Sequence, residues 1–124
     1  MNRFSGNTVI VTGSSSGIGA AIAHRFSEEG ANVVLNSRTR EDLENVAKDL
    51  PEERTLIVEG AIGGADFASE IVEKTVERFG GLDVLVNNAG IAASGPLAEA
   101  DDEDIESVID INVKGMLYVC RAAI

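Results

Sequence analysis

The chain has 124 residues, of which 44% are hydrophobic and 25% charged, so composition and length predict one soluble globular domain with a single core. Ten Lys and Arg against 21 Asp and Glu give a formal net charge of -11, which repels phosphate backbones and anionic lipid, so we expect no nucleic-acid and no membrane partner. With Cys120 as the only cysteine and no apolar run near the ~20 residues of a membrane span, we expect a cytoplasmic protein.

The first half of the chain alternates twice between strand and helix. Residues 8–12 (TVIVT) form a short β-branched run, which is typical of a strand buried on both faces. Apolar residues recur at helical spacing over residues 17–29, and a second strand is predicted at 32–36 (NVVLN). A second helix is expected between its N-cap at Thr39 and Pro51, which ends it.

The second half continues the same alternation. A third strand is predicted at residues 55–58, followed by a helix whose apolar positions run from Phe67 to Phe79. A fourth strand is predicted at 82–87. The acidic run Asp101–Asp104 then opens a last helix, whose final stretch, residues 116–124, contains no Gly, Asn or Pro to stop it.

Strict alternation of strands and helices predicts an α/β fold with a parallel sheet, because right-handed crossovers place helices on both faces. We therefore expect a Rossmann-like, doubly wound sheet of four strands in the order 3-2-1-4, with four helices. Since the last helix has no stop signal, we expect residues 1–124 to be a half-domain, truncated at its C-terminus, with an open edge on the fourth strand.

The loop between the first strand and the first helix is rich in glycine. Gly13 permits the sharp turn out of the strand, Gly17 lets the backbone approach a pyrophosphate, and Gly19 allows close packing of the helix. Amides at the helix N-terminus would face the phosphates, and the hydroxyls of residues 14–16 would add donors. Such loops also occur as plain tight turns, but this one lies between a strand and a helix, as nucleotide binding requires.

Three segments in order resemble the short-chain dehydrogenase/reductase family. They are T-G-x-x-x-G-I-G at residues 12–19, N-N-A-G at 87–90 and N-x-x-G at 112–115. The resemblance covers the whole chain but only the N-terminal half of the family's domain. It implies a dinucleotide site formed by Gly13, Ser15, Ser16, Gly17, Ile18, Gly19, Ser37, Arg38, Ala61, Ile62, Asn88, Ala89 and Gly90.

The end of the second strand separates NAD from NADP. An acidic residue there binds the ribose hydroxyls of NAD, whereas this chain has Ser37 followed by Arg38, a pair suited to a 2′-phosphate. We therefore expect NADP in preference to NAD, although Ser16 stands where many NADP-preferring members have a basic residue. Ala61 replaces the family's adenine-binding Asp, which leaves backbone groups and Ile62 to hold the ring at a cost of about 0.5–1.5 kcal/mol.

The resemblance also implies hydride transfer between a nicotinamide and a carbonyl or alcohol carbon. Family enzymes use a Ser, a Tyr and a Lys, with Y-x-x-x-K carrying the last two, and an Asn that supports a proton-relay water. Only Asn112 of this set is present by motif. The single tyrosine, Tyr118, has Ala122 at the lysine position, so we expect it to be a packing residue and the chain to be inactive alone.

Other chemistry-bearing residues have simpler interpretations. We expect His24 and Cys120 to pack, and we expect no metal site at the 101–104 acidic run, which lacks the spacing of a calcium loop.

An alternative function is a non-catalytic homo-oligomeric assembly module, pairing through the open fourth-strand edge or through the last helix. The apolar face of that helix comprises Ile105, Ile109, Met116 and Val119. An adenosyl cofactor is a third reading, but the N-N-A-G and N-x-x-G segments argue against it.

Overall fold

The fold is built on a parallel four-stranded sheet with the order β3-β2-β1-β4, as the alternation predicted. The computed structural model describes residues 2–91 and 95–124. Its strands are β1 (Thr8–Thr12), β2 (Asn32–Ser37), β3 (Thr55–Glu59) and β4 (Val84–Val86). β1 pairs with β2 and β4, and β2 pairs with β3, all in parallel. The predicted α/β, Rossmann-like doubly wound architecture is thus confirmed.

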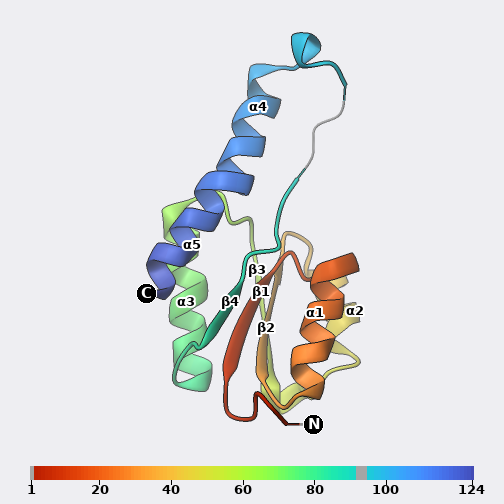
Figure 1. Ribbon diagram of the computed structural model, residues 1–124, viewed down its shortest axis with the longest axis vertical. Helices are drawn as coiled ribbons and strands as arrows, with labels where there is room; N and C mark the ends of the chain where they lie inside the picture. Colours follow the sequence, from red (N-terminus) through yellow and green to blue (C-terminus); the bar gives the residue numbers. More distant parts are fainter. Residues whose placement is uncertain (1, 92–94) are drawn as a thin grey trace.

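Helices cover both faces of this sheet (Figure 1). They are α1 (Gly17–Glu28), α2 (Arg40–Ala47), α3 (Ala65–Phe79), α4 (Asp102–Ile109) and α5 (Met116–Ala123), with short turns η1 (Glu52–Arg54), η2 (Leu97–Glu99) and η3 (Asp110–Gly115). α1 and α2 lie on one face, and α3 and α5 lie on the other (Figure 1). α2 ends before Pro51, and Thr39 takes its N-cap position without a side-chain capping bond.

The core forms two layers because successive strand residues point to opposite faces of the sheet. Val9, Val11, Val33 and Leu35 are fully buried on the side of α1 and α2. The alternate residues Ile10, Val34 and Val58 pack with Ile71 of α3 on the other side. The TVIVT run is therefore buried on both faces, as its continuous apolar pattern predicted.

The last helix differs from a plain α-helix in one respect. α4, η3 and α5 follow one another without a break, as predicted for a single helix, but residues 110–115 adopt a π-helical turn. The α5 half packs against α3, whereas the α4 half extends beyond the end of the sheet (Figure 1). π turns inside α-helices occur frequently at functional sites.

β4 is shorter than the predicted strand at 82–87. Asp83 still joins β1, because its side chain accepts a hydrogen bond from the Thr8 amide at 2.8 Å and its own amide donates to the Thr8 carbonyl at 2.9 Å. In the described part of the chain β4 pairs only with β1, so its outer edge is open. No helix within residues 2–91 or 95–124 is long and apolar enough to cross a membrane.

Candidate nucleotide-binding site

A cavity of about 440 Å³ opens where the loops leave the carboxyl ends of the strands. Carboxyl ends of parallel strands are where doubly wound sheets bind ligands. The lining residues come from the segments after all four strands and from the last helix: Gly13, Ser15, Ser16, Gly17, Ile18, Asn36, Ser37, Arg38, Thr39, Gly60, Ala61, Ile62, Asn88, Ala89, Gly90, Ile91 and Ile111. Every residue expected to bind the dinucleotide is in this set except Gly19.

The glycines of the loop after β1 are required by its backbone. Gly13 and Gly17 have φ values of +66° and +56°, a region that side chains with a Cβ adopt at a cost. A Cβ on Gly19 would lie 2.2 Å from the Gly13 carbonyl oxygen and 2.5 Å from Asn88 Nδ2. Gly19 therefore serves close packing, as expected, but against the loop and Asn88 rather than against the strands.

Thr12 and Asn88 fasten the loop after β4 to the glycine loop. Thr12 Oγ1 accepts hydrogen bonds from the amides of Asn88 and Ala89, both at 3.1 Å, and donates to the Val86 carbonyl at 3.3 Å. Asn88 Nδ2 donates to the Gly13 carbonyl at 2.9 Å. This network explains why a Thr-Gly pair and an N-N-A-G segment occur together, since each satisfies the polar groups of the other.

The N-terminus of α1 faces the cavity with unused donors. Ser16 is at the N-cap position with no capping bond, and within the described residues the hydroxyls of Ser15 and Ser16 have no hydrogen-bond partner. The first amides of the helix and the positive end of its dipole are therefore available to an anion. Ser14 differs from the expectation: it is buried and bonded to Asn36, so its hydroxyl cannot reach a ligand.

The far rim of the cavity carries one uncommitted cation. Arg38 is exposed and has no hydrogen-bond or ion-pair partner in the described ranges, whereas Arg40 pairs with Glu44 at 3.1 Å. The Ser37 hydroxyl is bonded locally to the Thr39 backbone. Ala61, which is exposed, and Ile62, which is 3% exposed, line the same cavity. Apolar side chains that share a cavity with a free guanidinium suit an aromatic ring that carries a phosphate nearby.

The N-x-x-G segment fastens the last helix to two loops of the cavity. Asn112 Oδ1 accepts from the Ile91 amide and its Nδ2 donates to the Ile91 carbonyl, both at 2.8 Å. A Cβ on Gly115 would lie 2.3 Å from the Ile62 carbonyl oxygen, so only glycine lets the helix approach this closely. Asn112 itself does not line the cavity, although its neighbour Ile111 does, and its catalytic role stays a prediction.

Comparison with known proteins agrees with this geometry. The family model described as short chain dehydrogenase matches residues 7–124. The chain belongs to the short-chain dehydrogenase family. An uncharacterized oxidoreductase of Staphylococcus saprophyticus is 42% identical over 118 residues, which cover 93% of this chain and 50% of the relative. One from Staphylococcus aureus strain USA300 is 37% identical over 124 residues, covering 100% and 54%. The chain thus spans about half the length of the curated relatives it matches.

Solved structures of short-chain dehydrogenases have the same fold. A short-chain dehydrogenase/reductase from Brucella melitensis, described as glucose/ribitol dehydrogenase, superposes with a TM-score of 0.93 at 41% identity, covering 97% of this chain and 51% of that one. A short chain dehydrogenase from Burkholderia cenocepacia, solved in complex with NADP, superposes with a TM-score of 0.90 at 34% identity, covering 98% and 51%.

Tyr118 of this short-chain dehydrogenase chain lies outside the cavity. Its ring packs beside the buried cluster of Ile62, Ala68 and Val119, and the Arg121 guanidinium stands 5.3 Å from the ring centroid. Cys120 accepts a weak hydrogen bond from Asn87 Nδ2 at 3.2 Å. Tyr118 packs, as expected, whereas Cys120 is only half-buried, and neither lines the cavity.

Some lining residues were missed by sequence reasoning. They are Asn36, Thr39, Gly60, Ile91 and Ile111. A signal existed for Asn36, because it is a polar residue directly after an apolar run that is typical of a strand buried on both faces of the sheet. Ile91 and Ile111 carried no signal, since an aliphatic side chain beside a motif is equally typical of the core.

Proposed function

We propose that residues 1–124 form the NADP(H)-binding part of an oxidoreductase that transfers hydride between the nicotinamide and a carbonyl or alcohol carbon. The observation that carries the proposal is the cavity at the carboxyl ends of the strands, onto which the N-terminus of α1 opens. The close approach at Gly19 fits the same purpose, because it draws the start of α1 against the loop that would cradle the pyrophosphate.

NADP is proposed over NAD because of the charges at the end of β2. No carboxylate lines the cavity in the described residues, and Arg38 is the uncommitted cation at its rim. A guanidinium can bind a 2′-phosphate with two parallel hydrogen bonds, while a carboxylate at this position would repel it. The Burkholderia cenocepacia relative solved with NADP is consistent with this choice.

We propose further that these 124 residues bind the cofactor without catalysing turnover by themselves. Tyr118, the only tyrosine, packs beside α3 rather than in the cavity, and the sequence has no Tyr-x-x-x-Lys. A positioned proton donor is typically worth about 10²–10⁴ in rate, so its absence removes most turnover. In the full reaction the nicotinamide would supply or accept the hydride, and the residues of this chain would bind and orient the cofactor.

Calorimetric titration of the 124-residue chain tests the proposal. NADPH should bind at one site per chain and more tightly than NADH, because only NADPH brings a 2′-phosphate to Arg38. A folded sample that gives no heat with either cofactor at millimolar concentration refutes the binding function. Equal affinity for the two cofactors would refute the specificity alone.

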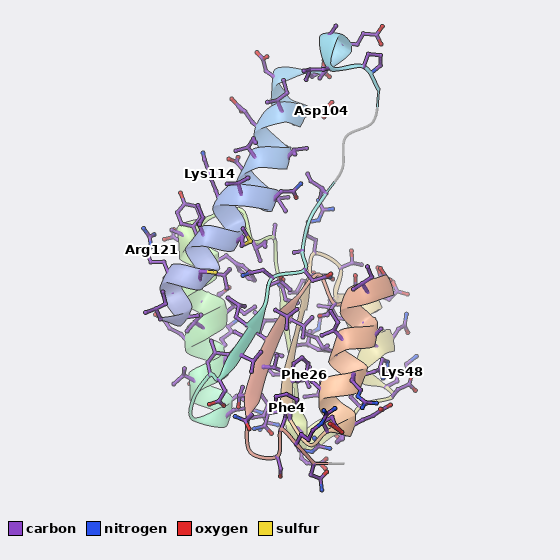
Figure 2. All side chains as sticks on the ribbon, in the orientation of Figure 1. Phe4, Phe26, Lys48, Asp104, Lys114 and Arg121 are labelled. Carbon is purple, nitrogen blue, oxygen red and sulfur yellow. The ribbon has the colours of Figure 1, made fainter. Side chains whose placement is uncertain are left out.

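A second candidate, a homo-oligomeric assembly module, is favoured by the surface of the last helix. Ile105, Ile109 and Met116 are 45%, 46% and 39% exposed, whereas Val119, predicted for the same face, is fully buried in the core. Acidic residues occupy the α4 half of this helix, and Lys114 and Arg121 occupy the other half (Figure 2). Antiparallel pairing of two copies would bring the acidic half of one helix against the basic half of the other.

The melting temperature separates this candidate from a monomer. In an assembly module it should rise with protein concentration, because association binds only the folded state. Ile105→Ser combined with Ile109→Ser should remove that dependence while leaving NADPH binding unchanged. A melting temperature independent of concentration over a hundredfold range would refute the module.

A further inference from the structure

Asn36 is a buried polar residue near the carboxyl end of β2. It is 1% exposed, and its backbone pairs in register with Thr12 of β1 and Val58 of β3. Its Nδ2 donates to the Val58 carbonyl at 2.9 Å and to the Gly60 carbonyl at 3.1 Å. Because carbonyl oxygens only accept, these partners fix which end of the carboxamide is the nitrogen.

The backbone of Asn36 is bonded to the glycine loop on the other side. Its amide donates to Ser14 Oγ at 2.9 Å, and its carbonyl accepts from the Ser14 amide at 2.9 Å. The next residue, Ser37, accepts from the Gly60 amide at 2.8 Å through its carbonyl. Asn36 therefore connects the segments that leave β1, β2 and β3, and all three of these segments line the cavity.

The remaining polar atom of this side chain, Oδ1, is the one that the protein does not use. It has no hydrogen-bond partner among the described residues, and no fully buried side-chain nitrogen or oxygen in those residues lacks a partner. Oδ1 is therefore not fully enclosed, and Asn36 lines the cavity. It offers a single acceptor, held in a fixed orientation, to an O–H or N–H donor of a ligand.

We infer that Asn36 positions the adenosine half of the cofactor. Its amide nitrogen holds Gly60 and the residues after it at a set distance from the Ser37–Arg38 rim, and its Oδ1 accepts from a ribose hydroxyl or the adenine amino group. This inference rests on the proposed dinucleotide function, in which the end of β2 receives the adenosine ribose. A leucine of similar size would keep the packing but remove the side-chain donor to the Val58 and Gly60 carbonyls.

Binding of adenosine 2′,5′-bisphosphate to the 124-residue chain tests the role of Asn36 in affinity. Asn36→Leu and Asn36→Thr should each raise the dissociation constant about tenfold, and the β-branched threonine keeps a strand-forming residue in case leucine prevents folding. Thr75→Val is the matched control. Thr75 is also fully buried, with its hydroxyl bonded to the Ile71 carbonyl at 2.7 Å, but it does not line the cavity. This control should bind the bisphosphate as the unsubstituted chain does.

Amide hydrogen exchange of the ligand-free chain tests, without any cofactor, whether the side chain of Asn36 holds Gly60 in place. The Gly60 amide should exchange faster in both Asn36 variants, while the Gly80 amide, bonded to the Val76 carbonyl at the far end of α3, should not change. Unchanged bisphosphate affinity in folded Asn36 variants overturns the inference and leaves the proposed function standing. An unsubstituted chain that binds neither NADPH nor the bisphosphate overturns the inference and the proposed function together. Unchanged exchange of the Gly60 amide in the Asn36 variants shows, whatever the binding result, that Asn36 does not hold Gly60 in place.

Discussion

Gly19 is the residue at which the site tolerates a side chain least. A Cβ there would overlap the Gly13 carbonyl oxygen at 2.2 Å, and the neighbouring backbone belongs to the loop that must hold the phosphates. Gly19→Ala should lower the free energy of unfolding by about 1–3 kcal/mol, as overpacking does, and should weaken NADPH binding. Urea unfolding followed by circular dichroism measures the first effect.

Gly81→Ala is the matched control for this substitution. A Cβ on Gly81 has nothing within 4 Å, and its φ is not in the left-handed region. Alanine there should leave stability unchanged or raise it by up to about 1 kcal/mol, because it restricts the unfolded chain. Equal midpoints for the two variants would contradict the close approach at Gly19.

Arg38 is expected to carry the preference for NADPH. Arg38→Ala should raise the dissociation constant of NADPH about 10–100-fold, since hydrogen bonds to charged groups contribute about 1.5–3 kcal/mol. The constant for NADH should change little. Arg40→Ala serves as the control, because Arg40 is already paired with Glu44. An equal loss of NADH and NADPH affinity in the Arg38 variant would show that this guanidinium does not bind the 2′-phosphate.

Glu29 links stability to pH at the end of α1. Its carboxylate is bonded to Arg3, which holds the pKa of Glu29 below its ordinary value of 4.5. A lowered pKa stabilises the folded state above the unfolded value, and this contribution is lost as pH falls through the folded value. Arg3→Gln should therefore reduce the free energy of unfolding at pH 7, and the reduction should diminish as pH falls through the lowered pKa of Glu29.

Urea unfolding at several pH values measures this dependence. Lys74→Gln is a suitable control, because Lys74 and Glu70 form an exposed pair 3.6 Å apart on α3, and such pairs contribute little. A stability loss in the Arg3 variant that does not diminish as pH is lowered through and below the lowered pKa of Glu29 would contradict a charge interaction with Glu29. The contact would then be one of packing beside Phe4 and Phe26, whose rings meet edge to face at 4.9 Å (Figure 2).

At the scale of elements, the last helix depends on Asn112 for its attachment to the loop after β4. Asn112→Ala leaves the Ile91 amide and carbonyl without their side-chain partners, so the free energy of unfolding should fall by about 1–3 kcal/mol. The Ile91 amide should also exchange hydrogen faster. Lys114→Gln is the control: its Asp110 partner raises the pKa of Lys114, but the pair is on the surface. Slow exchange at Ile91 in the Asn112 variant would contradict this attachment.

The elements themselves were predictable, but their fine geometry was not. Apolar periodicity and punctuation by glycine place β1, β2, β3 and α3 within a residue or two of their observed ends. The π turn at 110–115 has no residue signature of its own, because one extra residue per turn barely alters an apolar stripe. The short β4 likewise reflects hydrogen-bond geometry at Asp83 rather than a change in residue type.

At the scale of the whole molecule, parts of the site were predictable because motif residues follow strand ends, and parallel strands end at one edge of the sheet. Gly13, Ser37, Ala61 and Gly90 line one cavity for this reason. The contribution of Asn36 depends on bonds to two residues more than twenty positions away, which only the register of β2 and β3 brings within reach. No local pattern encodes that register.

The distribution of charge explains how a chain of net negative charge can bind an anionic ligand. The run Asp101–Asp104 lies at the start of α4, and Figure 2 places Asp104 on the part of that helix that extends away from the sheet. The cavity instead has Arg38 and the N-terminus of α1. Screening at physiological ionic strength acts over about 8 Å, so the local groups rather than the net charge of -11 determine anion binding.

An NMR titration of the isotopically labelled chain with NADPH tests most directly whether the cavity at the carboxyl ends of the strands binds NADP(H). We predict that amide resonances shift at Gly13, at residues 15–18, at Arg38 and at residues 60–62, with those of α4 unmoved. Saturable shifts confined to that set would establish both the ligand and its place. Shifts centred on residues 104–109 of α4, or none at millimolar NADPH, would contradict NADP(H) binding in this cavity.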